Sequence, residues 1–448
     1  MRRVLAFLLV GLVAAGCGFF RSAGKKEESL MPEGRYLVVT SVVEGSEAAR
    51  VGVKEGDIIL SYDGNAVSSV AQLNELKQTV KTEMVELAVL RKEKKKVFKI
   101  KKGQIGVYLA ERRPEVELAD DAVVLEGVGK LGWETGMSNS FIGAVAAIAE
   151  YLKLNKDYTY LMGVSGTAPR IHFHKDWCPS SPDPTVGFDT GSLALSALGL
   201  DYECHHLDTA DPAAGEMKEA VRKLIMESIN AGKPVIAIDL IEVPEWGVIT
   251  GYQNGGSEFL CRTYFDKQEG YSIAEKFPWA VVVLKDRKQA PSDMENYKNG
   301  LQVALKVATV DSFGDYYSGT EALKRWIHRL KMDNFADMDS AKFQDVWLAN
   351  AWIYQRLADD RTHAYAFLDG LAERFPVFKE KLAGLSEVYK VQVEILKKAA
   401  RSVPFPFAVA PGETWTGDMR AKEVDALEDV LEKEYEAVDI LKDINTRI

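Results

Sequence analysis

The stretch EGSEAARVGVKEGDIILSYDG, residues 44–64, decides the fold of the N-terminal part of this 448-residue chain. It follows an alternating apolar run at residues 36–43, which is typical of a β-strand. Gly52, Gly56 and Gly64 stand where tight turns need a positive φ, a conformation that glycine adopts without strain. The stretch therefore predicts a short helix, a turn, a second strand and a second turn.

The next elements complete a small domain. Apolar residues recur at helical spacing along residues 67–80, and residues 85–90 and 97–100 predict a hairpin around a basic turn at 91–96. This order of motifs closely resembles a PDZ domain, which we place at residues 33–112. The resemblance implies a β-barrel-like domain with a peptide groove beside its helix.

The predicted domain closes with GQIGVYL, residues 103–109. This end is similar to that of the permuted PDZ domains of bacterial site-2 proteases. In PDZ domains the equivalent loop offers backbone N–H groups to a peptide C-terminus, and the following strand pairs with the peptide. The alternative is a closing strand with a bulge glycine. The resemblance implies peptide binding by Gln104, Ile105, Gly106, Val107 and Leu73.

Residues 113–288 form a second predicted domain. GMSNSFIGAVAAI, residues 136–148, opens an apolar helix and matches the Gly-x-Cys-x-x-Phe pattern of papain-like hydrolases with Ser138 in the Cys position. LMGVSGTAPR, residues 161–170, resembles a segment of the butirosin-biosynthesis acyltransferase-like family. The strand of bacteriocin-processing and papain-like peptidases that begins with the catalytic His is similar to residues 245–252. The resemblance implies a papain-like α+β domain.

The catalytic residues of those families are not found at the matching positions. Glu245 or Trp246 stands where the His is expected, and a serine hydroxyl is a poor nucleophile without an adjacent base. We therefore expect a papain-like scaffold that serves as a binding module. The alternative is a hydrolase or acyltransferase that uses Ser138, with Glu245 as its base, or Cys178.

Two histidines precede Cys178. In IHFHKDWC, residues 171–178, an extended chain would place His172 and His174 on one face, and both are zinc-type ligands. Alternating residues of one strand seldom converge on one ion, so we predict no metal and no other cofactor. We expect the two histidines to form a polar pocket wall or to have a structural role, and zinc binding by His172 and His174 is the alternative. The papain-like layout also implies a pocket for a small molecule or peptide, lined by Trp177, Asp183, Glu245 and Trp246.

Residues 289–448 contain apolar stripes at helical spacing, such as Leu323, Trp326, Ile327 and Leu330. They predict a helical region that packs on the papain-like domain. The fold class is therefore α+β multidomain, with a β-barrel-like PDZ domain, a papain-like domain and a C-terminal helical region.

The N-terminus carries a targeting signal. A basic start, an apolar run at residues 4–13 and small residues are typical of a secretory signal, here residues 1–17. Cys17 after Ala-Ala-Gly resembles a bacterial lipobox, in which this Cys is lipidated, and residues 18–32 read as a linker. The alternative is an ordinary cleaved signal with a stray Cys. We expect an extracytoplasmic, lipid-anchored protein of the bacterial cell envelope.

Composition agrees with a folded body and limits its partners. Hydrophobic residues make up 47% and charged residues 27% of the chain, as in globular proteins. The formal net charge of -10 argues against a nucleic-acid partner. Besides Cys17 the chain has Cys178, Cys204 and Cys261, so at most one internal disulfide can form and its pairing stays open.

These features predict a protein with two partners, the membrane through its lipid anchor and a peptide or protein C-terminus through its PDZ domain. The papain-like domain would bind a second ligand without chemistry. In the alternative, that domain is a hydrolase or acyltransferase whose substrate the PDZ domain recruits. A scaffold for envelope assembly that uses neither cleft is the third possibility.

Overall fold

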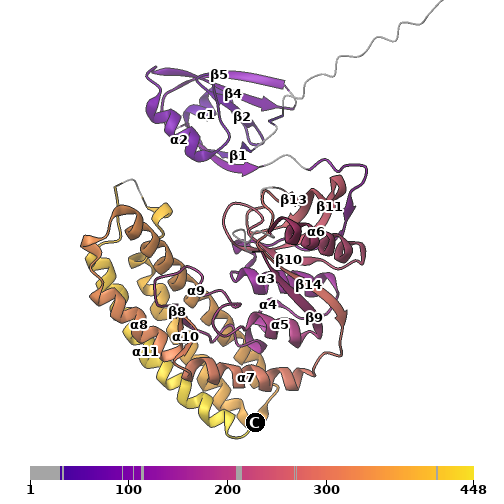
Figure 1. The fold of residues 1–448 in the computed structure, drawn as a ribbon. Helices are drawn as coiled ribbons and strands as arrows, with labels where there is room; N and C mark the ends of the chain where they lie inside the picture. The colour runs from indigo at the N-terminus through magenta and orange to yellow at the C-terminus, as the bar shows by residue number, and fades with distance from the viewer. Residues whose placement is uncertain are drawn as a thin grey trace, which may run out of the picture. The chain divides into compact units, whose positions relative to one another are not determined.

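The computed structural model describes residues 31–32, 35–92, 94–103, 105–112, 116–207, 214–266, 268, 270–409 and 412–448. The chain divides into two compact units, Met1–Pro114 and Glu115–Ile448. The expected signal with Cys17, nearly all of the linker, and Gln104 lie outside the described residues. Helices and strands are mixed in both units, and the C-terminal region is helical (Figure 1), which confirms the predicted α+β class.

The first unit is an antiparallel sheet with two helices. The strand order is β5-β4-β2-β1-β6, with β3 paired to β2. Leu37, Ile59, Leu87 and Ile100 are fully buried in its core. The elements are β1 (Tyr36–Val42), α1 (Glu47–Val51), β2 (Ile58–Tyr62), β3 (Asn65–Ala66), α2 (Val70–Thr79), β4 (Met84–Arg91), β5 (Lys94–Lys101) and β6 (Val107–Arg112).

The stretch at residues 44–64 forms the turns that join these elements. Ser46 accepts the amide of Ala49 at 3.2 Å and caps α1, and Gly52 ends the helix with a φ of 85°. Asp57 is fully buried and pairs with Arg91 at 2.5 Å. This pair ties the end of β4 to the turn before β2.

The second unit is built on a sheet ordered β13-β12-β11-β10-β14-β9, with β7 paired to β11, and on a small sheet ordered β15-β16-β8. Its strands are β7 (Val123–Val124), β8 (His172–His174), β9 (Leu200–His206), β10 (Val235–Ile238), β11 (Trp246–Gln253), β12 (Glu258–Arg262), β13 (Ser272–Ile273), β14 (Ala280–Arg287), β15 (Ser312–Phe313) and β16 (Tyr316–Ser318). The first helices are α3 (Ser140–Tyr151), α4 (Tyr158–Val164), α5 (Gly191–Ala197) and α6 (Ala214–Asn230), with 3-10 turns η1 (Trp133–Thr135) and η2 (Asn254–Gly256).

Both faces of the large sheet are covered because its strands alternate. In β10, Ile236 and Ile238 belong to the core shared with α3, α4 and α5, whereas Val235 and Ala237 belong to the core shared with α6. Helix α3 is the central element, since residues 140–149 are all buried.

The helical region packs on the same unit (Figure 1). Side chains of α4, α7, α9, α10 and α11 share one core, to which Leu161, Leu301, Leu368, Leu385 and Leu441 contribute. Within the described part of the chain, no helix has the length and apolar character needed to span a membrane. The remaining elements are α7 (Asp293–Thr309), α8 (Gly319–Met332), η3 (Phe335–Asp337), α9 (Ser340–Ala372), η4 (Pro376–Phe378), α10 (Lys379–Ala399), η5 (Ala400–Ser402), η6 (Pro406–Ala408) and α11 (Gly417–Asn445).

Candidate functional site

The start of helix α3 is fixed from several sides. Asn139 is the N-cap and accepts the amide of Ile142 at 3.2 Å, while its own amide donates to the Tyr158 hydroxyl at 2.7 Å. Helix α3 therefore begins at Ser140, and its positive end and unpaired N–H groups face the loop that carries Ser138.

Ser140, rather than Ser138, is the serine that meets Glu245. The Trp246 amide donates to Ser140 Oγ at 3.3 Å, and the Ser140 hydroxyl acts to lower the pKa of the neighbouring Glu245 carboxylate. Ser140 is the first helical residue and lies against the start of β11. Ser138 precedes the N-cap, and its hydroxyl contacts Asp359 instead of Glu245. The serine beside Glu245 therefore lies two residues after the one that the sequence predicted.

The pKa of the Glu245 carboxyl group is raised toward neutral pH. Burial raises its pKa to about 7, the Ser140 hydrogen bond and Arg356 oppose this rise, and Asp183 adds to it. A carboxylate that is about half ionised at neutral pH can accept and return a proton. The Ser140–Glu245 pair thus has a hydroxyl and a base in contact.

Ser138 contacts the helical region instead. Its hydroxyl donates to Asp359 Oδ1 at 3.1 Å, and Asp359 Oδ2 lies 3.6 Å from Arg356 Nη2 and 3.9 Å from His363 Nε2. His363 is held in turn by the Thr159 hydroxyl, 2.9 Å from its Nδ1. The carboxylate beside Ser138 therefore comes from α9, more than 200 residues away in the sequence.

Three of the four expected pocket residues come together. The Trp246 indole donates to Asp183 Oδ2 at 2.8 Å and lies edge-on to Phe141, with ring centres 5.0 Å apart. Glu245 stands directly before Trp246. Trp177 belongs elsewhere, because its indole donates to Asp333 at 2.8 Å and its ring packs in the core of the helical region.

Helix α9 adds buried charges that the sequence analysis missed. Arg356 and Asp360 are each 5% exposed, and burial raises the pKa of Asp360 to about 7. Arg356 Nη1, Asp360 Oδ1 and Arg170 Nε have no hydrogen-bond partner among the described residues. Such atoms usually bind ordered water or a ligand. The available signal was the spacing of four between Arg356 and Asp360, which places both on one helix face.

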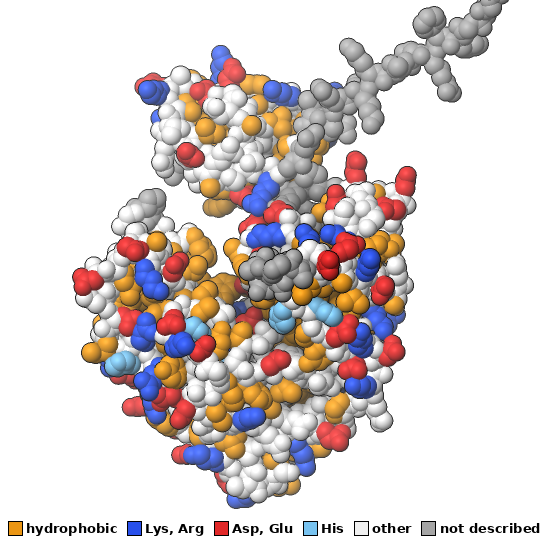
Figure 2. All heavy atoms as spheres, in the orientation of Figure 1, with side chains coloured by type: hydrophobic (Ala, Val, Ile, Leu, Met, Phe, Trp, Pro, Cys, Tyr) orange, Lys and Arg blue, Asp and Glu red, His pale blue; other side chains and the backbone are white. Residues whose placement is uncertain are grey.

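A row of aromatic side chains lies near the start of α3. Trp133 is 38% exposed and packs against Tyr264 at 5.2 Å, Phe265 at 5.4 Å and Trp352 at 6.3 Å between ring centres. Trp352 in turn packs against Phe405, with their ring centres 5.8 Å apart. Figure 2 shows a hollow between the helical part and the sheet part, with hydrophobic side chains on both walls.

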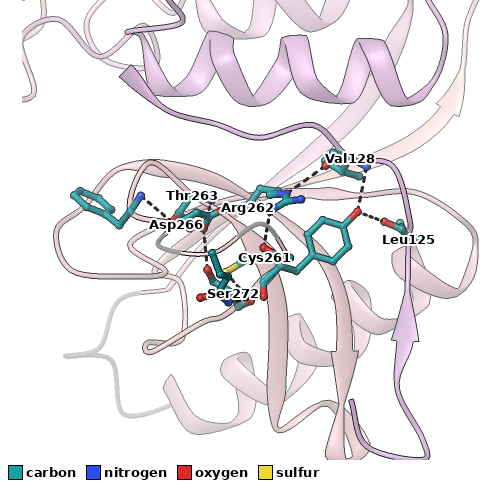
Figure 3. Close-up of polar contacts among 11 residues, drawn as sticks. Leu125, Val128, Cys261, Arg262, Thr263, Asp266 and Ser272 are labelled. Carbon is teal, nitrogen blue, oxygen red and sulfur yellow. Dashed lines mark hydrogen bonds and ion pairs between the residues drawn. The ribbon is translucent and has the colours of Figure 1, made fainter. Parts of the chain in front are cut away.

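A polar network holds the loop that braces α3 (Figure 3). Asp266 Oδ1 accepts the Thr263 hydroxyl at 3.1 Å and the Ser272 hydroxyl at 2.9 Å, and Arg262 donates to the Gly270 carbonyl at 2.6 Å. Tyr264 follows directly in this loop. It donates to the Met137 carbonyl and lies so close to Gly143 of α3 that no side chain would fit there. The network therefore positions the loop that holds the start of α3.

Cys178 and the two histidines each have their own neighbours. Cys178 Sγ lies 2.9 Å from the Ser180 hydroxyl. His172 is buried beside Tyr316, and His174 Nδ1 accepts the Asp176 amide at 3.1 Å. In the described ranges no three His, Cys, Asp or Glu side chains converge as metal ligands.

The sequence allowed at most one disulfide among Cys178, Cys204 and Cys261 and left its pairing open. Cys178 and Cys204 form no disulfide bond, and the Cys261 thiol donates to the Ser272 carbonyl at 3.4 Å.

The first unit has its own candidate site at β6. The amides of Val43 and Ala48 donate to the carbonyls of Gly106 and Ile105, both at 2.9 Å. Since Val42 lies opposite Val107, this pattern turns the Val107 amide away from β1. Within the described residues β6 ends the sheet, so this amide faces an open edge.

Gly106 allows the loop before β6 to approach α1. Its φ is 81°, and a side chain here would overlap Ser46, whose hydroxyl donates to the Gly106 carbonyl at 3.2 Å. The start of α2 is tied to β6, because the Val70 amide donates to Glu111 at 3.0 Å.

The residues expected to contact a peptide differ in exposure. Leu73 is fully buried and Ile105 is 1% exposed, so both side chains belong to the core of the domain. Helical periodicity turns Leu73 into the core and leaves its neighbours on α2 nearer the surface. The partly buried apolar side chains on the same core are Val70, Leu76, Val80, Val107 and Leu109.

Comparison with known proteins identifies a domain in the first unit. Residues 38–91 match the family model of the PDZ domain, so the first unit contains a PDZ domain, as predicted. The chain is also similar to the crystal structure of a PDZ domain protein from Parabacteroides distasonis, with 10% identity and a TM-score of 0.13. That match covers 62% of this chain and 59% of the other, so less than two thirds of that protein is spanned. No curated protein matches the sequence.

Proposed function

We propose that this protein binds the C-terminal ends of peptides or proteins between β6 and α2 of its PDZ domain. The observation that carries this proposal is the open edge of β6 directly after the Gly106 loop. An extended peptide can pair with the outward amide of Val107, and its carboxylate can accept N–H groups of the loop. Val70 and Leu76 offer apolar surface to the last side chains of such a peptide.

The proposal also gives this binding a place in the cell. The basic start, apolar run and Ala-Ala-Gly-Cys sequence of residues 1–17 support export and lipid attachment at Cys17. Residues 18–32 would then tether the PDZ domain outside the cytoplasm, on a membrane of the bacterial envelope.

We expect Gly106→Asp to weaken the binding of peptides that carry a free C-terminal carboxylate by about tenfold or more, a loss of about 1.4 kcal/mol or more. The new side chain displaces the loop from Ser46 and places a negative charge beside the carboxylate. Fluorescence polarisation with labelled peptides measures the effect. Gly56→Asp is the matched control, because Gly56 also has a positive φ of 82° but open space around it.

The proposal requires recognition of the peptide end. Amidated peptides should bind as weakly as free peptides bind to Gly106→Asp. Equal peptide affinity of Gly106→Asp and Gly56→Asp, with both variants shown to be folded by circular dichroism, would contradict peptide binding beside the Gly106 loop.

For the second unit we propose a papain-like scaffold that binds a second ligand. Support comes from the central helix α3, which packs on an antiparallel sheet and has its N-terminus at the start of β11. The unpartnered Arg356 Nη1 and Asp360 Oδ1 offer a donor and an acceptor to that ligand.

A second candidate function is acyl transfer, which the position of Glu245 beside Ser140 favours. In this reaction Ser140 Oγ bonds to the acyl carbon, and its proton passes to the Glu245 carboxylate. The leaving group takes that proton as its bond to the acyl carbon breaks, and water then releases the acyl group.

A fluorophosphonate probe distinguishes the two candidates. For acyl transfer we expect labelling of Ser140 that rises with pH about a midpoint near 7, the pKa of Glu245. Ser140→Ala should abolish labelling, Glu245→Gln should reduce it about a hundredfold, and Ser138→Ala should leave it unchanged. If the native chain is not labelled, acyl transfer is contradicted and ligand binding remains the proposed function of the second unit.

A further inference from the structure

One hairpin of this acidic protein is strongly basic. Residues 91–102 carry eight Lys and Arg side chains, although the whole chain has a net charge of -10. They belong to β5 and its two ends, and β5 is the outermost strand of the PDZ sheet (Figure 1). The charge is therefore presented along one edge of the domain.

Most of these charges have no structural partner. Arg91 pairs with Asp57, and Lys102 Nζ donates to the Val80 carbonyl. The lysines of β5 are exposed, and none forms an ion pair with a described carboxylate: they are Lys94, Lys95, Lys96, Lys99 and Lys101. Their ammonium groups are available to an external anion.

The outward side of the hairpin also carries apolar side chains. Ile100 of β5 is buried in the core, so the alternation of the strand turns Lys95, Val97, Lys99 and Lys101 outward. Val97 is 50% exposed, and Met84, which lies opposite Lys101 on β4, is 49% exposed. We call these five residues the basic face.

Two described acidic side chains adjoin this surface, and one of them, Glu47, accepts the Lys101 amide at 2.8 Å and is paired with Arg50. The other, Glu86, is exposed and lies opposite Lys99 in the register of β4 and β5. It offsets one positive charge, and the basic face keeps an excess of two, to which Lys94 and Lys96 at the edge add.

We propose that the basic face docks on an anionic lipid bilayer. Lysines near such a surface are attracted by its negative potential, and their aliphatic stems lie along the apolar boundary. Val97 and Met84 can enter the headgroup region between them. The proposal rests on the proposed anchor at Cys17, since a random coil as long as the fifteen residues 18–32 would span only about 20 Å.

Docking in this way leaves the peptide groove accessible. The sheet runs from β5 at one edge to β6 at the other, so the basic face and the groove lie at opposite edges. The bilayer would hold the domain with β6 away from the lipid.

Lysines on an edge strand also prevent pairing between sheets. That role needs charge but neither exposed apolar neighbours nor affinity for lipid. Vesicle binding therefore separates the two explanations.

The test uses the chain from residue 18 onward, which keeps both units whole and lacks the acyl anchor. We expect it to sediment with vesicles of phosphatidylglycerol and phosphatidylcholine in equal parts, less so as salt is raised, and not with phosphatidylcholine alone. The triple variant Lys95→Glu/Lys99→Glu/Lys101→Glu should lower the partition coefficient about tenfold or more.

The control variant Lys390→Glu/Lys397→Glu/Lys398→Glu makes the same change in net charge on exposed α10 positions and should bind like the native chain. Val97→Ser/Met84→Ser should weaken binding without a change in charge. Equal binding by both lysine variants, or no binding to the anionic vesicles, would overturn the proposal. Peptide binding by Gly106→Asp and membrane attachment through Cys17 are separate measurements, so either outcome here leaves them intact.

Discussion

Arg361→Met should lower the free energy of unfolding of the second unit by about 3–5 kcal/mol. Arg361 is fully buried in α9, where it donates to Gln392 Oε1 at 2.7 Å, to the Ala168 carbonyl at 2.7 Å and to Glu434 Oε2 at 3.0 Å. Methionine fills similar space but leaves the buried Glu434 carboxylate without its counter-ion. Urea unfolding followed by circular dichroism measures the loss.

Two further variants separate the buried ion pair from general disruption. Arg361→Met/Glu434→Leu removes both charges and should recover much of the stability, because no uncompensated charge remains. Arg325→Met breaks the surface pair with Glu321, whose side chains are 50% and 20% exposed, and should cost less than about 1 kcal/mol. Similar losses for Arg361→Met and Arg325→Met would contradict this account.

Arg361 also supports the candidate site of the second unit. Arg361 joins α9, α10 and α11 to the segment after α4, and its helix also carries Arg356 and Asp360. Loss of this bond should therefore loosen the helix that supplies charge to the Ser140–Glu245 pair.

Glu423→Gln should make the protein more stable by about 3 kcal/mol at pH 7 and leave its stability unchanged below about pH 4.5. Glu423 is fully buried in α11 and accepts the Asn350 amide at 2.8 Å. Burial raises the pKa of Glu423 from 4.5 to about 8. Folding therefore takes up a proton between these two pH values, and the stability of the native protein falls as the pH rises through that window.

Glutamine keeps the acceptor for Asn350 and has no proton to lose, so the variant should lack this part of the pH dependence. Thermal or urea unfolding at pH 4.5, 7 and 8 gives the difference between the two proteins. Glu432→Gln on the exposed side of α11 is the control and should follow the native curve. A constant difference between native protein and Glu423→Gln across the window would show that Glu423 is already ionised in the fold.

The sequence by itself determined the PDZ domain, because the features that define it are local. Glycine turns and alternating strands lie within one short stretch, and each acts over a few residues. The amphipathic pattern after residue 289 predicted the helices for the same reason. Side-chain periodicity is a property of the local chain.

Only the tertiary structure decided the site of the second unit. Whether Ser138 or Ser140 meets Glu245 depends on where α3 begins, and the Asn139 cap and the Tyr264 loop set that start. Arg356 and Asp360 come to this site from a helix more than 200 residues away, and burial gives Glu245 and Asp360 their raised pKa values. Such contacts arise from long-range packing and desolvation, which no short motif encodes.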